Sequence, residues 1–498
     1  MFPPIPLSKN FFSQKATSLL VFLLFALFAF SFYAEQIPVN NGAGFDGAFY
    51  REVFRNFSTD IFTVGYDSFR IQRIFPFCLM NMVYNLAGIP LDNTHMMAGM
   101  VVCHFLNLAV QVLFFFKLAK LKGWKSVTKV ILFSLFFFNF AVLKDNSFEP
   151  FQTDAFAVTI ALVSYYVFLT GKNATAFAIS LLGLVTWPTV TYVMIPLIIF
   201  QNKGNLASAP GPFYARFFRL LPFAYAVPAI ALVALSFILH KEACLNGLLL
   251  TSPKPSLIIF SLVAIVVCGW LVASTQKLPP FPYTLTDVLK SFRLRPAIGI
   301  TICIVSISAI LRIFANEEFF FDGKLFLLQV IARPLKFPLI TFVGHFVYWG
   351  LLPVFLLIFA RDFVKEFMEK SPGHALALLF FIFFALDSEG RHIAPLLPLL
   401  LVPLGSVLDK ANFAPKAAFF TVISQLILSH FYMTINVDGF TESLEQGDFF
   451  TPVAQRFFMN NGPWMTDTSY FCWIAIAFAA IIITIVVFKH AKRPQSGQ

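Results

Sequence analysis

A short stretch near the N-terminus, Asn41 to Tyr50 (NGAGFDGAFY), combines one carboxylate with several glycines and aromatic rings. Asp46 is the only acid in it, and the glycines allow the backbone to turn tightly and to approach a ligand closely. Arginines follow at positions 51, 55, 70 and 73. A carboxylate backed by arginines suits chemistry on a phosphate-bearing substrate, in which the acid accepts a proton. A solvated loop is the simpler interpretation of any single acid in such a position.

Two of these arginines, Arg70 and Arg73, are three residues apart. On a helix this spacing places both guanidinium groups on one face, as a fork suited to a phosphate or diphosphate. Arginines that reach from an interfacial helix toward water have the same spacing. The sequence leaves both interpretations open.

A second cluster, Lys144 to Asp154 (KDNSFEPFQTD), contains three carboxylates. Asp154 stands where the next apolar run begins, and its simplest role is to cap a helix. Glu149 precedes Pro150 and has no such structural reason to be there. We therefore treat both acids as candidate site residues.

A third cluster, Leu386 to Pro398 (LDSEGRHIAPLLP), places Asp387, Glu389, Arg391 and His392 between two apolar runs. Charged residues next to membrane helices are costly and tend to mark a site. The cluster predicts either a substrate cavity or a network of charges that neutralise one another.

The composition restricts the class of protein. The chain has 498 residues, of which 58% are hydrophobic and only 12% are charged. A soluble protein of this length has no place for so much apolar surface, so the chain is an all-α polytopic membrane protein. The six cysteines form neither a disulfide framework nor a zinc motif, and the histidines show no metal spacing either.

Apolar runs of spanning length predict 12 to 14 membrane helices. The run from Ser18 to Tyr33 is expected to remain as a first helix, and the long run 174–200 to turn back outward at Trp187-Pro188 because proline cannot continue a helix. The other expected spans lie near 95–118, 127–143, 155–170, 220–239, 256–273, 297–314, 338–360, 393–408, 416–433 and 470–488, with a short one at 374–386.

Charge supports this topology. The side that we assign to the cytoplasm holds 23 of the 36 Lys and Arg and 5 of the 25 Asp and Glu, a net charge of +18. The other side carries −7, and the two together give the total of +11. This asymmetry follows the positive-inside rule and places both termini in the cytoplasm. The basic composition therefore reports membrane orientation, and a nucleic-acid partner is not expected.

The segment Gln201 to Pro212 is the predicted boundary between an N-terminal transmembrane module, 1–200, and a C-terminal one, 201–498. The outer loops of the first module are expected to be catalytic. The outer segments 315–337 and 434–469 of the second are expected to cover the site and to select the acceptor.

The Asp-Gly-x-x-Tyr motif after the first span, the acidic loop before the fourth and the late Glu-x-Arg-x-x-x-Pro entry to a span resemble the GT-C superfamily. Its members are integral-membrane glycosyltransferases that use polyprenyl-phosphate-linked sugars. The resemblance covers about the first 200 residues and 386–398. It implies a GT-C-like fold with short amphipathic helices on the outer face, and transfer of a hexose or pentose to a glycan, lipid or protein acceptor.

The resemblance also implies roles for individual residues. It assigns catalysis to Asp46, as base, with Glu149 and Asp154, and donor-phosphate binding to Arg391 with Arg70 and Arg73. Substrate-binding residues are expected at Tyr50, Trp187, Asp387, Glu389 and His392. The chain has a single Asp in the first loop, without an adjacent acid, so no metal ligands are assigned and a divalent metal cofactor stays open. The expected place is a bacterial inner membrane, with the site on the periplasmic side.

Two other classes are compatible with the sequence. A transporter or flippase for a lipid-linked or anionic substrate explains the many spans and the proline-broken helix, but it predicts charges near the middle of the bilayer. A polymerase or ligase of lipid-linked glycans shares the donor class.

Overall fold

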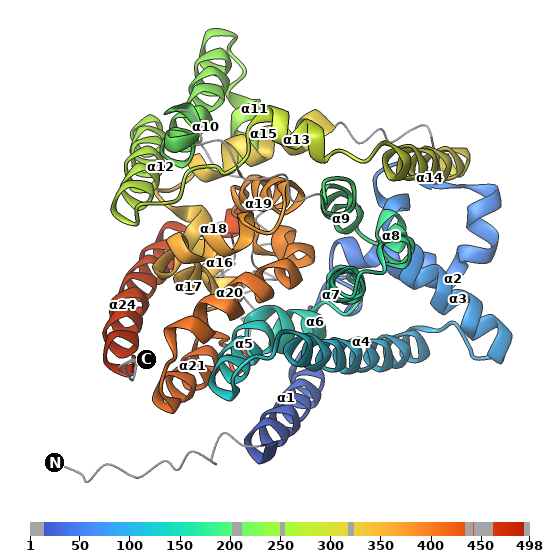
Figure 1. Ribbon diagram of the computed structural model, residues 1–498. Helices are drawn as coiled ribbons and strands as arrows, with labels where there is room; N and C mark the ends of the chain where they lie inside the picture. Colours follow the sequence, from blue (N-terminus) through green and yellow to red (C-terminus); the bar gives the residue numbers. More distant parts are fainter. Residues whose placement is uncertain are drawn as a thin grey trace.

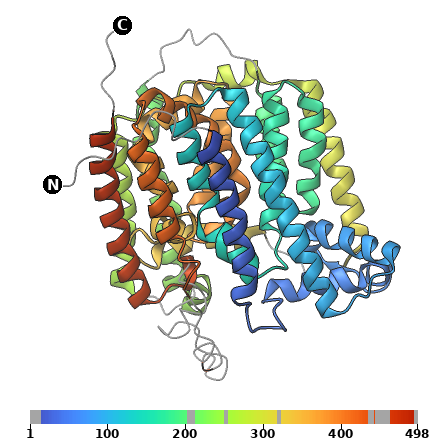
Figure 2. The same cartoon turned by 90° about the horizontal axis from the view of Figure 1, so that it is seen from below.

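The computed structural model describes residues 14–201, 212–249, 254–316, 323–433, 442 and 462–492. Within these ranges the chain is almost entirely helical, as its composition predicts. Figure 2 shows the long helices side by side, with the start of the first helix and the end of the last one at the same end of the bundle. The predicted boundary segment 201–212 and the outer segment 434–469 lie largely outside the described residues.

The first part of the chain supplies the candidate site loops. Its elements are α1 (Gln14–Ala34), α2 (Asp46–Thr63), β1 (Tyr66–Asp67), η1 (Arg70–Arg73), α3 (Phe75–Ala87), α4 (Asn93–Lys122), α5 (Ser126–Phe137), η2 (Ala141–Asp145), α6 (Asn146–Phe148), α7 (Asp154–Leu169), α8 (Asn173–Leu181), η3 (Leu182–Val185) and α9 (Thr189–Ile199). In Figure 1, α2 and α3 form a lobe beside the end of α4.

The middle part contains long apolar helices and one short strand. Its elements are α10 (Pro212–Ile238), α11 (Glu242–Leu249), α12 (Pro255–Thr275), α13 (Leu285–Ser291), α14 (Leu294–Ile313), β2 (Ala315–Asn316), α15 (Gly323–Ala332) and η4 (Arg333–Leu335). The last part consists of α16 (Ile340–Trp349), α17 (Leu352–Ile358), α18 (Ala360–Met368), α19 (Pro372–Ala385), η5 (Gly390–Leu396), α20 (Leu397–Ala411), α21 (Pro415–Leu428), η6 (Gly462–Trp464) and α24 (Asp467–Ala491).

Six helices among the described residues are long and apolar enough to cross a membrane, or eight if each of two bent pairs counts as one span. Several shorter apolar helices accompany them, including most of α1 and all of α7, α9, α19 and α21. The structure thus has the expected polytopic all-α character. The total of 12 to 14 spans stays a prediction, because it requires these shorter helices to cross as well.

Two expected spans are broken in ways that the hydropathy pattern did not predict. The run 338–360 divides into α16 and α17 at Gly350, which has a φ of +63°. A Cβ at Gly350 would collide with the side-chain oxygen of Gln425, so only glycine fits there. The run 127–143 bends by 48° between α5 and the following η2–α6 segment.

The predicted turn at Trp187-Pro188 is confirmed. Helices α8 and α9 pack against each other and are separated by η3 and the residues Thr186 to Pro188. Both arms are short. The hairpin begins at the end of the bundle where α7 finishes, and its tip points toward α2 and α3, where η3 contacts η1. In Figure 1, α9 stands beside α19 on one side and close to α7 and α8 on the other.

Buried residues form one large core and several smaller ones. The large core joins α4, α5, α7, α9 and the helices from α16 to α24. A second core lies under the lobe formed by α2 and α3 and includes Tyr50, Phe54, Phe77, Met100 and Phe151. Aromatic side chains remove a large apolar area from water, which fixes the lobe against the start of α4.

A two-residue parallel ladder ties the outer lobe to the end of α14. Tyr66 pairs with Ala315, and Asp67 pairs with Asn316. The amide N–H of Tyr66 also donates to the carbonyl of Phe314 at 3.1 Å. These backbone contacts therefore hold the loop between α2 and α3 to the end of α14.

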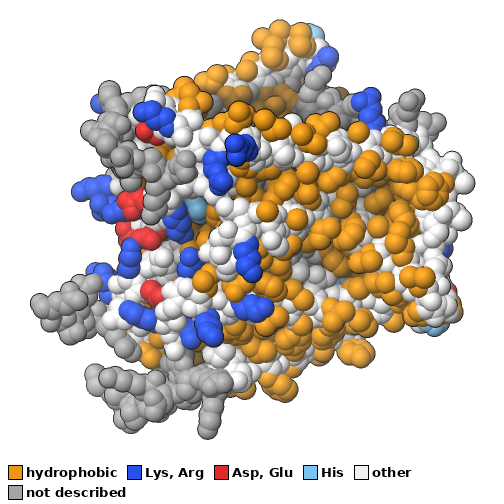
Figure 3. All heavy atoms as spheres, turned by 45° about the vertical axis from the view of Figure 1, so that its right-hand side comes forward, with side chains coloured by type: hydrophobic (Ala, Val, Ile, Leu, Met, Phe, Trp, Pro, Cys, Tyr) orange, Lys and Arg blue, Asp and Glu red, His pale blue; other side chains and the backbone are white. Residues whose placement is uncertain are grey.

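Charge and hydrophobicity separate along the bundle axis. Lys and Arg side chains gather toward one end of the molecule, and a wide hydrophobic band covers the flank (Figure 3). At the end where α1 begins, Lys125 contacts Asp409 and Asn412, and Lys410 pairs with Glu366. The three polar clusters predicted to form the site lie at the opposite end, with α2 and α3.

Candidate functional site

The first outer loop is packed directly against the second. Gly44 has a φ of +80°, and a Cβ placed on it would lie 3.2 Å from the carboxyl carbon of Glu149. A Cβ on Gly47 would lie 3.1 Å from Cβ of Phe151. The glycines therefore serve a close approach between two loops, and they bring Asp46 to the acidic segment before α7.

Asp46 is the first residue of α2 and lies between two arginines. Its Oδ1 is 3.4 Å from Nη2 of Arg70, and its Oδ2 is 3.6 Å from Nη2 of Arg391. Its side chain is 36% exposed, so a soluble or interfacial substrate can reach it. A carboxylate at a helix N-terminus is also favoured by the helix dipole. Asp46 is thus accessible at the meeting point of two distant segments.

The Arg70–Arg73 pair forms a short 3₁₀ helix, in which residues three apart lie on one face as expected. The two guanidinium groups take different partners. Arg70 contacts Asp46 and, at 3.7 Å, Asp67. Arg73 lies between two rings, 4.3 Å from the centre of Phe69 and 4.2 Å from that of Trp187. The predicted fork therefore borders the site without acting as one clamp.

The tip of the α8–α9 hairpin closes one side of this region. Trp187 is 3% exposed, stacks with Arg73 and lies 6.3 Å from the ring of His392. Trp187 therefore joins the first outer loop to the third cluster. A cation against an indole face gains about 0.5–2 kcal/mol, depending on its desolvation.

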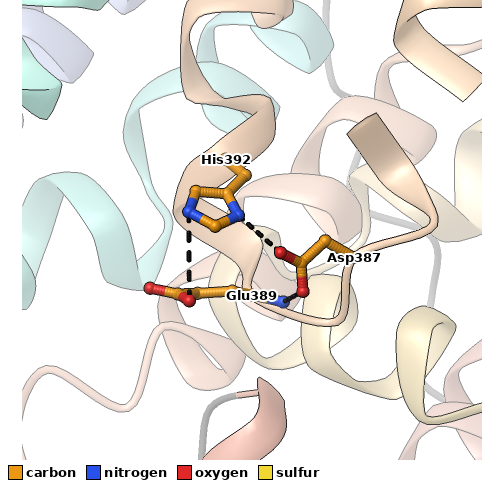
Figure 4. A group of neighbouring side chains, drawn as sticks. All are labelled: Asp387, Glu389 and His392. Carbon is orange, nitrogen blue, oxygen red and sulfur yellow. Dashed lines mark hydrogen bonds and ion pairs between the residues drawn. The ribbon is translucent and has the colours of Figure 1, made fainter. Parts of the chain in front are cut away.

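The third cluster is a network of opposite charges, the alternative that the sequence left open. Arg333 Nη1 lies 3.0 Å from Asp387 Oδ2 and 2.9 Å from Glu389 Oε2. His392 Nδ1 lies 2.7 Å from Asp387 Oδ2, and Arg391 Nε donates to Glu389. Figure 4 shows one carboxylate at each ring nitrogen of His392, with Asp387 at Nδ1 and Glu389 at Nε2.

Burial and pairing act in opposite directions on these acids. Burial by itself would raise the pKa of Asp387, but the neighbouring His392 and Arg333 hold it below its usual value. Burial would likewise raise the pKa of Glu389, but Arg391, His392 and Arg333 together hold it below its usual value. Asp387 is fully buried and Glu389 nearly so. They position Arg391 and His392.

Arg333 was not among the predicted site residues. It lies in η4, just before the 100° bend between the helical segments Phe326–Leu335 and Ile340–Trp349. The signal in the sequence is a charged residue followed by Pro334 within an otherwise apolar run. A buried arginine needs a partner, so this pattern pointed to an acid elsewhere in the chain.

Asp387, Glu389 and His392 also have the donor atoms and mutual distances of a metal site. Arg333, however, already contacts both carboxylates with one nitrogen, at 3.0 and 2.9 Å. A guanidinium group held there neutralises the two acids and occupies the space between them. The donor set therefore does not fit a divalent cation in this arrangement.

The second outer loop contributes two buried acids, Asp145 and Asp154, and the half-buried Glu149. Gln152 donates to Glu149, and burial raises the pKa of Glu149 to about 7 against the opposing charge of Arg391. Asp154 is buried at the first position of α7, and within the described part of the chain its Oδ1 has no hydrogen-bond partner. Asp145, not assigned a role from the sequence, accepts a hydrogen bond from Tyr348.

These residues converge on Arg391. Asp46, Glu149 and Asp154 all interact electrostatically with its guanidinium group, in addition to Glu389. The structure thus brings together three segments that are far apart in the chain. The lobe core closes the region from behind: Tyr50 is buried, stacks on Phe77 at 4.9 Å, and burial raises its pKa to about 12.

An apolar cavity of about 320 Å³ lies next to the charged network. Its lining includes Pro334, Leu386 and Ile393, which adjoin Arg333, Asp387 and His392 in the chain. The remaining walls come from α12, α16, α17 and α19. Volumes of roughly 300–1,000 Å³ with apolar walls are typical of ligand pockets.

The site therefore combines an accessible acid, paired arginines, buried acids and an apolar cavity at one end of a helical membrane protein. Comparisons of the chain with protein-family models, with curated proteins and with solved structures find no match.

Proposed function

We propose that the chain is a membrane glycosyltransferase of the GT-C type, which moves a sugar from a polyprenyl-phosphate-linked donor to an acceptor at the outer membrane face. The observation that carries the proposal is the position of Asp46 between Arg70 and Arg391. The apolar cavity supports it, because Leu386 and Ile393 in its wall flank the segment that contains Arg391. A lipid phosphate needs both features, cations for its phosphate and an apolar place for its chain.

The donor is bound by its two ends. Arg391 and Arg70 contact the phosphate oxygens, and the first isoprene units enter the cavity lined by Pro334, Leu386 and Ile393. Asp46 then loses its two arginine partners to the phosphate. The freed carboxylate is then available to the acceptor hydroxyl, so donor binding prepares the base.

The reaction is a direct displacement. The acceptor hydroxyl oxygen forms a bond to the anomeric carbon while the bond from that carbon to the phosphate oxygen breaks. The hydroxyl proton passes to Asp46, and the electron pair of the broken bond stays on the leaving phosphate. A single displacement inverts the anomeric centre, and positive charge develops on the sugar ring. Arg391 and Arg70 stabilise the added negative charge of the leaving group.

Supporting groups keep this geometry. Glu389 holds the guanidinium group of Arg391, and Arg333 holds Glu389. Glu149 and Asp154 interact electrostatically with Arg391, and this helps to keep its guanidinium group in place before the donor arrives.

Two features favour a second candidate, a transporter or flippase for a lipid-linked anion. Two helix pairs are bent, by 48° and 100°, and transporters build their sites from discontinuous helices. Asp145 lies buried in the first of these pairs. The two candidates make opposite predictions in detergent, where no transmembrane gradient exists.

The test uses the purified full-length protein in detergent, a polyprenyl phosphate with labelled sugars, and measures release of sugar from the lipid. Wild type should transfer or hydrolyse the sugar. Arg391→Lys keeps the charge but loses the planar fork, so it should bind the donor less well and turn over much more slowly. Arg361→Lys, an exposed arginine of α18, is the matched control and should behave as wild type.

No release from any of several donors, together with uptake of the lipid-linked substrate into sealed vesicles, would instead establish the transporter. Equal rates for Arg391→Lys and Arg361→Lys would remove Arg391 from donor binding.

A further inference from the structure

A second cavity lies at the end of the bundle opposite the candidate site. It has a volume of about 580 Å³ and is formed between α18, α20 and the last turn of α24. Helix α18 is amphipathic: Phe363, Val364 and Phe367 are buried, whereas Arg361 and Asp362 are exposed. Nothing in the proposed reaction uses this part of the molecule.

The rim of this cavity has a positive net charge. Four lysines line it, Lys365, Lys410, Lys489 and Lys492, with only two acids, Asp362 and Glu366. Lys410 is already paired with Glu366. Within the described part of the chain, the side chains of Lys489 and Lys492 form no ion pair or hydrogen bond, so their charge is available to a ligand.

The wall below the lysines is aromatic. Phe359, Phe413 and Phe488 all line the cavity and pack on one another, with ring centres 4.7 Å apart for Phe413 and Phe488 and 6.0 Å apart for Phe359 and Phe413. These rings are the kind of surface on which a hydrocarbon chain packs. A small soluble anion would gain nothing from contact with these rings.

The cavity is accessible from the membrane side. In the apolar stretch of α24 only 17% of the residues are buried, and Ile482, Ile485 and Val486 near its end are exposed. A lipid in the surrounding leaflet therefore reaches the cavity along α24. Basic pockets between helices on the cytoplasmic side are suited to anionic head groups.

We propose that this cavity binds one anionic phospholipid. Its phosphodiester group contacts Lys489 and Lys492, and the first part of an acyl chain packs on Phe413 and Phe488. The bound lipid bridges α18, α20 and α24, so it should stabilise the packing of α24 on the rest of the bundle. The inference is independent of the reaction proposed for the opposite end.

The test measures thermal unfolding of the purified full-length protein in a neutral detergent during titration with phosphatidylglycerol. Wild type should be stabilised with a saturable dependence on this lipid. Lys489→Gln/Lys492→Gln should raise the half-saturating concentration by roughly tenfold or more, since each lysine near an anionic lipid contributes strongly. Lys277→Gln/Lys290→Gln removes the same charge from exposed positions at the same end, outside the cavity, and should match wild type.

Two further titrations separate the sources of the negative charge. Phosphatidylcholine and inorganic phosphate at equal ionic strength should each give little stabilisation. An equal response to inorganic phosphate would overturn the assignment to a lipid. Equal lipid responses in the two double variants would overturn the assignment to this cavity. Lys365→Gln, at the exposed rim, provides a milder variant with an expected shift of several-fold in the same direction.

Discussion

Asp46 Oδ2 lies 3.6 Å from Nη2 of Arg391, although the two residues belong to elements far apart in the chain, α2 and η5. The contact is long for an ion pair, and Asp46 remains partly exposed. A pair of this kind separates at little cost when a stronger anion arrives, because exposed ion pairs contribute only about 0–1 kcal/mol. The relationship therefore suits a site in which substrate phosphate replaces the acid.

The first prediction concerns the base. Asp46→Asn keeps the shape of the side chain but cannot accept a proton, so the turnover number should fall by about 10²–10⁴-fold. Donor binding should change little, because Arg391 and Arg70 remain. Asp60→Asn, at the other end of α2, is the control with the same chemical change and should retain full activity. Near-normal turnover of Asp46→Asn would transfer the role to Asp154.

The second prediction concerns pH and Glu149. Burial raises its pKa from the usual 4.5 to about 7, so between these values the folded protein binds more protons at this residue than the unfolded chain does. The contribution of Glu149 to stability therefore falls as the pH rises from about 4.5 to 7. Above pH 7 its cost reaches roughly 3 kcal/mol.

The measurement compares Glu149→Gln with wild type by thermal unfolding at pH 5 and pH 8. The variant should unfold at a higher temperature than wild type at pH 8, and the difference should largely disappear at pH 5. A difference that does not depend on pH would mean that Glu149 is ionised throughout this range.

The third prediction concerns the arginine that the sequence did not reveal as part of the site. Arg333→Met removes the partner of Asp387 and Glu389 and leaves two buried acids with less compensation. Breaking such a buried network costs about 3–5 kcal/mol. Adding Glu389→Gln to Arg333→Met removes one of the unpaired charges and should recover part of the lost stability.

Unfolding in denaturant or heat, on protein in detergent, gives the comparison. Arg312→Met, at the end of α14 and outside the network, is the control and should change stability by less than the Arg333 variant. Equal losses in both variants would show that the network does not support the fold.

The fourth prediction concerns the approach of the two outer loops. Gly44→Ala and Gly88→Ala both place a side chain at a positive φ, +80° and +64°, with a backbone cost of about 1–2 kcal/mol each. Only at Gly44 does the new Cβ also press on a neighbour, the Glu149 carboxyl group, because nothing lies within 4 Å of the position at Gly88. Gly44→Ala should therefore lower activity as well as stability, whereas Gly88→Ala should lower stability alone. The assay is sugar transfer by each variant, measured after folding has been checked.

Local sequence patterns predict much of the architecture. Apolar runs locate the membrane helices, and Pro188 marks the turn of the α8–α9 hairpin because proline cannot continue a helix. The distribution of lysines separates the two ends of the bundle. The three polar clusters come together at one end of the bundle because the helix before each cluster runs toward that end.

The details of the site depend on packing that no local pattern contains. Arg70 and Arg73 share a face, as their spacing predicts, but the position of Trp187 decides that Arg73 stacks on a ring. The pairing of Arg333 with Asp387 and Glu389 requires the bend before α16, which hydropathy does not reveal. Glu389 is buried and accepts a hydrogen bond from Arg391, an arrangement that its place beside a span does not predict.

The distance along the chain between Asp46 and Arg391 has a consequence for biosynthesis. The ribosome completes the first outer loop long before it reaches Arg333 and Arg391. During that interval Asp46, Glu149 and Asp154 have none of the arginine partners that the later segments supply, and they must be hydrated at the membrane surface. A nascent chain interrupted before residue 390 thus contains all three acids of the proposed reaction and lacks the cation on which they converge.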